Sequence, residues 1–266
     1  MSEGDGNIVV SRAEDLWRVA TRRNFLKVLG LGGTIVLMPS VFAACDDGTD
    51  GVTNPGGGSA ALNLSNDIGI LNYAFALEQL EAAFYTAVVA SAAFGGMTAE
   101  QKEVMMDLRA HEVAHREFLR AALGSAAIGD LALNSANVAT AVSSTAIILK
   151  NAEAFEDLGV SAYNGAGKYI QDANYLLLAG KIVSVEARHA AAIRDLREGL
   201  SLAGTPAGTR FAGDDVVNPQ GLDVKTEPAG VLTRVGATQL VTTAISIATP
   251  PTVTAATADA PPPPTP

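Results

Sequence analysis

Cysteine is almost missing from this chain of 266 residues, which has only Cys45. A single thiol cannot form an intrachain disulfide, and it excludes a zinc or iron site built from four cysteines. Tryptophan also occurs once, and aromatic residues make up 5% of the sequence, whereas alanine is abundant. Small apolar faces of this kind favour closely packed helices over a sandwich of β-branched strands.

An excess of basic charge is missing as well. The chain has 18 Lys and Arg residues against 28 Asp and Glu residues, for a formal net charge of −10. An acidic surface repels phosphate backbones, so it argues against nucleic acid as a partner. The same negative charge helps solubility and attracts cations weakly. Most of these charged residues are nevertheless explained by an ordinary solvated surface.

The segment at residues 21–27 reads TRRNFLK and is followed by a moderately apolar run, residues 28–44. Paired arginines before Phe-Leu-Lys and an apolar run resemble a bacterial twin-arginine export signal. The run contains glycine and is too short to span a bilayer comfortably. We therefore predict that residues 1–44 are a signal peptide and that the protein is exported to the periplasm or cell envelope.

The apolar run ends in Phe42-Ala43-Ala44-Cys45, which resembles the processing site of a lipoprotein. On this interpretation Cys45 is lipidated and anchors the protein to the membrane. The alternative is ordinary cleavage, for which Val41-Phe42-Ala43 is an acceptable site. Gly, Asp and Pro dominate the next stretch, so residues 45–63 are predicted to form a flexible tether.

Helical periodicity dominates the middle of the chain and predicts an all-α domain over residues 64–204. A serine-, alanine- and asparagine-rich stretch, residues 124–144, separates the second helix from the third. A connection of that length suits a bundle in which a long crossover joins parallel helices. The predicted helices cover residues 67–93, beginning at an N-cap Asp67, then 98–123, 145–170 and 172–202.

The remainder of the chain is less regular. Residues 205–248 alternate Gly, Asp and Pro with short Val and Leu patches, and we expect them to pack on the bundle as an irregular segment. Residues 249–266 are rich in Pro, Thr and Ala and are predicted to be a disordered tail.

Two spacings occur twice in the helical region. A glutamate lies seven residues before a tyrosine, and a second glutamate lies three residues before a histidine. Residues three apart share a face of a helix, so four helices can bring four carboxylates and two imidazoles together. The repeated pairs are Glu78 with Tyr85, Glu112 with His115, Glu156 with Tyr163, and Glu186 with His189.

This set of side chains suits a pair of metal ions. Four carboxylates buried together repel one another strongly, and two divalent cations neutralise them. Mixed oxygen and nitrogen ligands suit iron (Fe) or manganese (Mn) and tolerate zinc. The sequence therefore predicts two divalent ions, Fe first and Mn second.

Several other residues compete for roles. Glu81 and Glu153 each lie three residues from a predicted ligand, but neither has a counterpart in the internal repeat, so we expect them to be solvated or to contact ligands. Tyr85 and Tyr163 are candidate catalytic residues, either bonding to a ligand or acting as redox-active phenols, and simple core packing is the alternative.

A rival interpretation comes from His111-Glu112-Val113-Ala114-His115, which reads HExxH as in zinc proteases. That pattern leaves Glu186, His189 and both Glu–Tyr pairs unexplained, and it offers no third ligand at an expected spacing. The metalloprotease is therefore the weaker alternative, and His111 is expected on the helix surface or beside a ligand.

The strings LEQLEAAFYTA, AHEVAHREFL, AFEDLGVSAYNGA and SVEARHAAAIR together resemble the ferritin-like domain family, in particular its exported bacterial branch related to desiccation-associated proteins. The resemblance implies a four-helix bundle, with one Glu from each of two helices and Glu-x-x-His from each of the others. It also implies metal ions and oxygen or peroxide as partners, and it allows a homo-oligomer. The implied metal ligands are Glu78, Glu112, His115, Glu156, Glu186 and His189.

Two functions follow as expectations. The first is an oxidoreductase of ferroxidase or peroxidase type that acts in stress defence. The second is a non-enzymatic, stress-protective or scaffold lipoprotein with the same bundle, so the sequence leaves enzymatic activity open. A rubrerythrin-type peroxidase carries an added four-cysteine iron domain, which one cysteine cannot supply.

Overall fold

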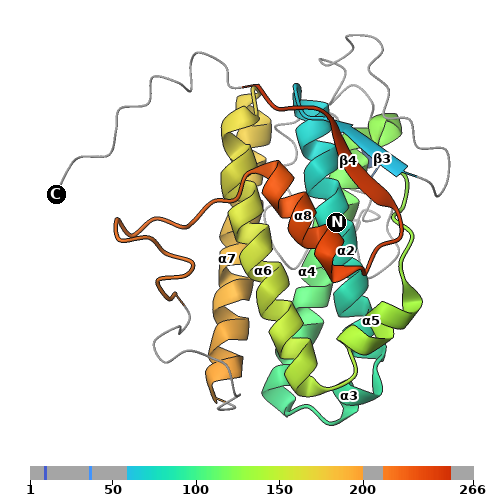
Figure 1. The fold of residues 1–266 in the computed structure, drawn as a ribbon, viewed down its shortest axis with the longest axis vertical. Helices are drawn as coiled ribbons and strands as arrows, with labels where there is room; N and C mark the ends of the chain where they lie inside the picture. The colour runs from blue at the N-terminus through green and yellow to red at the C-terminus, as the bar shows by residue number, and fades with distance from the viewer. Residues whose placement is uncertain (1–8, 11–35, 38–58, 200–211, 253–266) are drawn as a thin grey trace, which may run out of the picture. The chain divides into compact units, whose positions relative to one another are not determined.

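The computed structural model describes residues 9–10, 36–37, 59–199 and 212–252 (Figure 1). The chain divides into two units, residues 1–50 and residues 51–266. In the first unit, strand β1 (Val9–Val10) pairs in parallel with β2 (Val36–Leu37). The twin-arginine segment and the predicted lipid anchor Cys45 lie outside the described residues.

The second unit contains four long helices, of which α2 packs chiefly on α4 and α6 chiefly on α7. In Figure 1, α2 and α7 run downward while α4 and α6 run upward, so each pair is an antiparallel hairpin. This arrangement confirms the predicted four-helix bundle with a long crossover between the second and third helices. The helices are α2 (Asp67–Ala90), α4 (Ala99–Leu123), α6 (Thr145–Ala166) and α7 (Ala173–Gly199).

The crossover is more ordered than its composition suggested. It contains the 3₁₀ turn η4 (Gly124–Ala126) and the short helix α5 (Ser135–Ala141). Two buried amide side chains on one face of α2 hold it in place. Asn72 donates to the carbonyl of Ala126 and accepts from the amide of Ile128, at 2.9 and 2.7 Å. Gln79 likewise accepts from the Leu131 amide at 2.8 Å, so buried polar groups fix the connection to the bundle.

The helix ends differ in detail from the prediction. The N-cap of α2 is Asn66, whose side chain accepts from the amide of Gly69. The prediction of Asp67 as the cap was wrong because Asp67 bonds elsewhere: its carboxylate accepts from the amides of Gln171 and Asp172, just before α7. Asp67 therefore ties the start of α2 to the start of α7.

Serine and glycine end two of the helices. At Ser91 the backbone turns extended, so α2 stops there and a short helix, α3 (Ala92–Gly95), follows. The helix α6 ends at Ala166, where the 3₁₀ turn η5 (Gly167–Tyr169) begins, although the sequence predicted a helix to residue 170. A capping box between Thr98 and Gln101 begins α4.

Two strands flank the bundle and correct the expected tether. Strand β3 (Ser59–Asn63) pairs in parallel with β4 (Ala244–Thr249), and Ala60 and Leu62 of β3 are fully buried. The predicted flexible range 45–63 therefore ends in an ordered strand, because alternate residues of β3 bury apolar side chains. The range predicted to be irregular, 205–248, likewise contains helix α8 (Pro228–Thr238) and most of β4. Residues 253–266 of the predicted tail lie outside the described part.

Helix α8 packs on α6 and buries Val231 and Val235. Within the described residues, no helix is both long and apolar enough to cross a membrane.

A glycine lets the segment before α8 approach α6. The amide of Thr226 donates to the carbonyl of Ser161 at 2.9 Å, and a β-carbon at Gly165 would lie 1.9 Å from the Thr226 carbonyl oxygen. We therefore expect Gly165→Ala to displace this segment and lower the free energy of unfolding by about 1–3 kcal/mol. Urea denaturation measures the change.

The matched control is Gly180→Ala in the middle of α7, where no atom lies within 4 Å of an added β-carbon. Because alanine favours helix, this variant should gain about 0.5–1 kcal/mol. Equal effects of the two substitutions would contradict the close approach at Gly165.

Candidate metal centre

The six predicted ligands converge halfway along the bundle, because each of the four long helices carries its residues on its inward face. Two overlapping groups of four residues have ligand atoms within 4.8 Å of one another, and both groups contain Glu112 and Glu186. The four carboxylates are completely buried, and His189 is 4% exposed. The groups are Glu78, Glu112, His115 and Glu186, and Glu112, Glu156, Glu186 and His189.

Each imidazole faces carboxylates from more than one helix. The Nδ1 atom of His115 lies 3.1 Å from Glu186 Oε1, 3.3 Å from Glu112 Oε2 and 3.4 Å from Glu78 Oε2. The Nδ1 atom of His189 lies 2.8 Å from Glu112 Oε1 and 3.2 Å from Glu156 Oε2. Glu112 therefore touches both histidines and sits at the middle of the cluster.

The two tyrosines cross between the hairpins. Tyr85 donates to Glu156 Oε1, and Tyr163 donates to Glu78 Oε1, each at 2.5 Å. Each phenol thus bonds to the glutamate of the other half, whereas the sequence paired it with the glutamate of its own helix. Tyr85 also packs in the core, edge-on against Phe84 with ring centroids 5.1 Å apart. Tyr85 therefore both bonds to a predicted ligand and packs in the core, as the two alternatives from the sequence proposed.

Several buried polar atoms of the cluster make no hydrogen bond of good geometry. Buried polar groups are nearly always hydrogen-bonded, so several that only approach an imidazole mark a place that could hold another group. The chemistry of these atoms, carboxylate oxygens and an imidazole nitrogen, is that of a cation site. They are Glu78 Oε2, Glu112 Oε1, Glu156 Oε2, both oxygens of Glu186 and His189 Nδ1.

Electrostatics agree with the geometry. Burial raises the pKa of Glu112 to about 7 and raises that of Glu186 well above its usual value, with neighbouring carboxylates adding to both. Burial opposes a charge on His189, but contact with Glu112 and Glu156 raises its pKa to about 11. Burial would also raise the pKa of Glu78, but the adjacent His115 lowers it. Without metal, the cluster therefore holds protons in place of cations.

A family comparison agrees with this geometry. The family model described as the ferritin-like domain matches residues 66–199, which span the four long helices and half of the chain. The chain belongs to the ferritin-like domain family. The search of curated proteins found no match.

This ferritin-like domain holds one further buried carboxylate beside the cluster. Glu81 was expected to be solvated or to contact a ligand, and it is 4% exposed. A β-carbon at Gly159 would lie 3.1 Å from both Glu81 Oε1 and Glu186 Oε2, so the two carboxylates flank the space beside this glycine. Burial, then Glu186, raises the pKa of Glu81 well above its usual value. The signal was in the repeat itself, where Gly159 occupies the position equivalent to Glu81.

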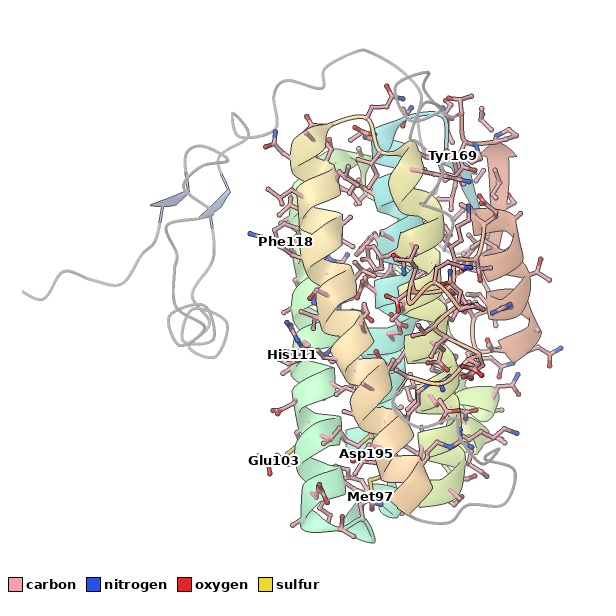
Figure 2. The ribbon with its side chains drawn as sticks, turned by 90° about the vertical axis from the view of Figure 1, so that its left-hand side faces the viewer. Met97, Glu103, His111, Phe118, Tyr169 and Asp195 are labelled. Carbon is pink, nitrogen blue, oxygen red and sulfur yellow. The ribbon has the colours of Figure 1, made fainter. Side chains whose placement is uncertain are left out.

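The other competing residues lie outside the cluster. Glu153 forms an ion pair with Arg197. His111 is exposed on α4 (Figure 2), and its Nδ1 lies 2.9 Å from His189 Nε2, on the far side of that ring from the carboxylates. The HExxH segment therefore does not direct His111 and His115 at one metal position, and neither group of potential ligands among the described residues includes His111.

The raised pKa values predict an unusual pH dependence for the metal-free protein. Glu112 titrates near 4.5 when unfolded and near 7 when folded, so its proton stabilises the fold fully below about pH 4.5, and this contribution is lost as the pH rises through 7. His189, raised from 6.5 to about 11, changes stability in the same direction. Glu78, with its lowered pKa, acts oppositely but only in acid.

We therefore expect the free energy of unfolding of the metal-free protein to fall by about 1–3 kcal/mol between about pH 5 and pH 8. Urea titrations across this range test the prediction, and Glu112→Gln should flatten the curve because it removes the titrating group. A metal-free stability that rises over the same interval would contradict it.

Proposed function

We propose that this ferritin-like protein binds two divalent metal ions, Fe first and Mn second, and oxidises Fe(II) with oxygen or peroxide. One observation carries the proposal: two groups of potential ligands overlap at Glu112 and Glu186. Residues shared by two groups are suited to bridge two ions. Glu78 with His115, and Glu156 with His189, would then complete one ion each.

The residues fit such a pair in charge and in chemistry. Four buried carboxylates carry a charge of −4, which two divalent ions neutralise. Each group offers three carboxylates and one imidazole, a mixed oxygen and nitrogen set that suits Fe or Mn. When bound, a pair of Fe(II) ions supplies two electrons, which with two protons reduce dioxygen to hydrogen peroxide, or peroxide to two waters.

The surrounding residues position these ligands. Tyr163 and Tyr85 each donate to one oxygen of a glutamate, at 2.5 Å. The Oε2 atoms of Glu78 and Glu156 make no hydrogen bond and face the imidazoles, so they are the oxygens that would bind a cation. His111 contacts the outer nitrogen of His189 and so directs its Nδ1 toward the carboxylates. Glu81 supplies an additional carboxyl group at the edge of the cluster. Each tyrosine hydroxyl donates to a predicted ligand, so it would hold a proton beside a bound metal.

Substitution of the central glutamate tests metal binding and oxidation together. We expect Glu112→Gln to bind less than half of the wild-type metal and to slow Fe(II) oxidation by about 100-fold or more, because one oxygen ligand and one bridging charge are lost. The measurements are metal analysis of purified protein and absorbance-monitored Fe(II) oxidation. Glu103→Gln on the exposed side of α4 (Figure 2) is the matched control and should change neither.

Near-zero metal in wild-type protein produced with iron and manganese supplied would refute the proposal. Bound metal with equal oxidation rates in wild type and variant would instead favour the non-enzymatic lipoprotein.

The contact between His111 and His189 gives a second test. Because an outer partner fixes a ligating imidazole, we expect His111→Ala to weaken metal affinity by about 10–100-fold while the free energy of unfolding stays within about 0.5 kcal/mol. Competition with a chromophoric chelator measures the affinity. Arg109→Ala, exposed on the same helix, should leave the affinity unchanged. Unaltered affinity in His111→Ala would show that His189 needs no outer support.

The cell location belongs to the same proposal. The twin-arginine signal and a lipid at Cys45 would place the domain in the periplasm or cell envelope, and that export route carries proteins already folded and loaded with cofactor. The sequence resemblance to desiccation-associated proteins supports a role in stress defence.

A further inference from the structure

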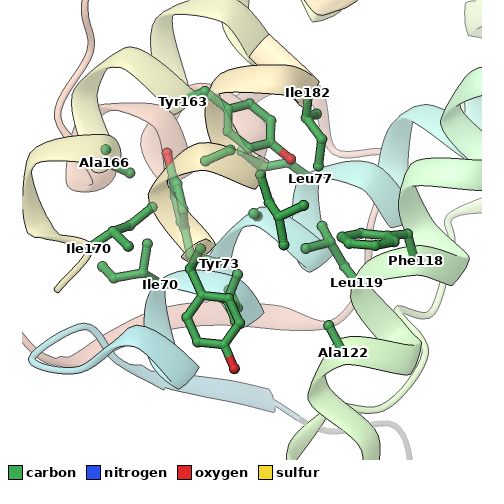
Figure 3. Close-up of a pocket in the computed structure, with 16 residues that line it drawn as sticks. Ile70, Tyr73, Leu77, Phe118, Leu119, Ala122, Tyr163, Ala166, Ile170 and Ile182 are labelled. Carbon is green, nitrogen blue, oxygen red and sulfur yellow. The ribbon is translucent and has the colours of Figure 1, made fainter. Parts of the chain in front are cut away.

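A small apolar cavity lies between the four helices, on one side of the carboxylate cluster (Figure 3). Its volume is about 30 Å³, and nearly all atoms that line it are apolar. On α2 its residues precede Glu78, and on α7 they precede Glu186. On α4 they follow His115, and on α6 they follow Glu156. Because the helices alternate in direction, these stretches all lie toward the same end of the bundle.

The inner end of the cavity reaches the cluster. Tyr163 lines the cavity with its ring, and its hydroxyl bonds to Glu78 Oε1 at 2.5 Å. Leu77, the neighbour of Glu78, lies beside Tyr163 in Figure 3. One phenol ring therefore separates the apolar space from a predicted metal ligand.

The cavity exists on one side of the cluster because the two halves of the repeat carry different side chains. Around Tyr85, the rings of Phe84 and Phe155 pack edge to face with centroids 4.9 Å apart. The shift along the chain that carries Tyr85 to Tyr163 also carries Phe84 to Ala162. It carries Val88 to Ala166 and, in reverse, Phe155 to Leu77. Of these replacements, Leu77 and Ala166 line the cavity, so smaller side chains leave space beside Tyr163 in this half.

The size and the apolar lining of the cavity determine which small molecule can occupy it. A water molecule needs roughly 10–15 Å³ and two to four polar partners, so the volume suffices for one or two small molecules but the lining offers water almost no partner. Hydrogen peroxide, which carries two hydroxyl groups, is disfavoured for the same reason. Dioxygen is small and apolar and meets both conditions. Phe118 and Leu178, which are only half-buried, line the side of the cavity that is nearest to solvent.

We propose that this cavity binds dioxygen and delivers it to the metal centre past Tyr163. The inference rests on the proposed function and narrows it, since it names dioxygen rather than peroxide as the oxidant that the bundle admits by this route.

The first experiment uses xenon, an apolar atom that occupies dry cavities. Metal-free crystals pressurised with xenon should show it bound between Leu77, Tyr163 and Ala166. Xenon should be lost from Ala166→Val and from Leu77→Phe, which give this half the larger residues of the other. The control is Ala191→Val on α7, because Ala191 faces a different cavity. This variant adds the same volume as Ala166→Val and should still bind xenon beside Tyr163.

The second experiment measures Fe(II) oxidation by the metal-loaded protein at limiting oxidant. We expect both cavity-filling variants to lower kcat/KM for dioxygen by about tenfold and to leave the rate with peroxide and the metal stoichiometry unchanged. Circular dichroism checks that each variant is folded. If one of the two variants does not fold, the other is enough for the test.

No xenon in the wild-type cavity would overturn the inference, and so would unchanged oxygen kinetics in a variant that excludes xenon. An equal loss with both oxidants would also overturn it, since that result indicates general damage to the site. A wild-type protein that binds no metal would end the proposed function itself, whereas metal-loaded protein without cavity xenon would leave that function standing.

Discussion

The burial of several like charges at one point is the constraint on which the rest of this structure depends. Glu78, Glu112, Glu156 and Glu186 are completely removed from solvent, and Glu81 nearly so. Such a cluster is tolerable only with cations or with bound protons. The fold supplies the remaining compensation through two imidazoles and two phenols, which approach the carboxylates from all four long helices. The four helices therefore position the buried carboxylates together with the groups that stabilise them.

Helical periodicity, which is a local property, predicted the four helices and placed each Glu–His pair on one helix face. The resemblance to the ferritin-like family implied that the six residues meet. The sequence could not predict which glutamate each tyrosine contacts, because that depends on how the hairpins dock. The same limit explains the strand Ser59–Asn63. Its partner lies at residues 244–249, and nothing in the polar stretch before it indicates a pairing across the whole domain. The helix cap at Asn66 rather than Asp67 was missed because Asp67 bonds to a distant loop.

The internal repeat is most informative where it fails. The second half has Gly159 at the position equivalent to Glu81. The Glu81 carboxylate of the first half lies beside this glycine, where a side chain would otherwise be. At Ala166 the second half has a smaller side chain than its equivalent Val88, and Ala166 lines the apolar cavity beside Tyr163. A pseudo-symmetric cluster thus sits in asymmetric surroundings, with an additional carboxyl group on one side and open apolar space on another. The two groups of potential ligands consequently have different surroundings, although each consists of three carboxylates and one imidazole.

The crossed bonds between tyrosines and glutamates have a consequence for the order of folding. Each group of potential ligands takes residues from both hairpins, and neither hairpin contains the partner of its own tyrosine. A nascent chain with only the first hairpin complete could therefore retain an ion only weakly. Tight uptake of metal would become a late event that reports successful docking of the two halves.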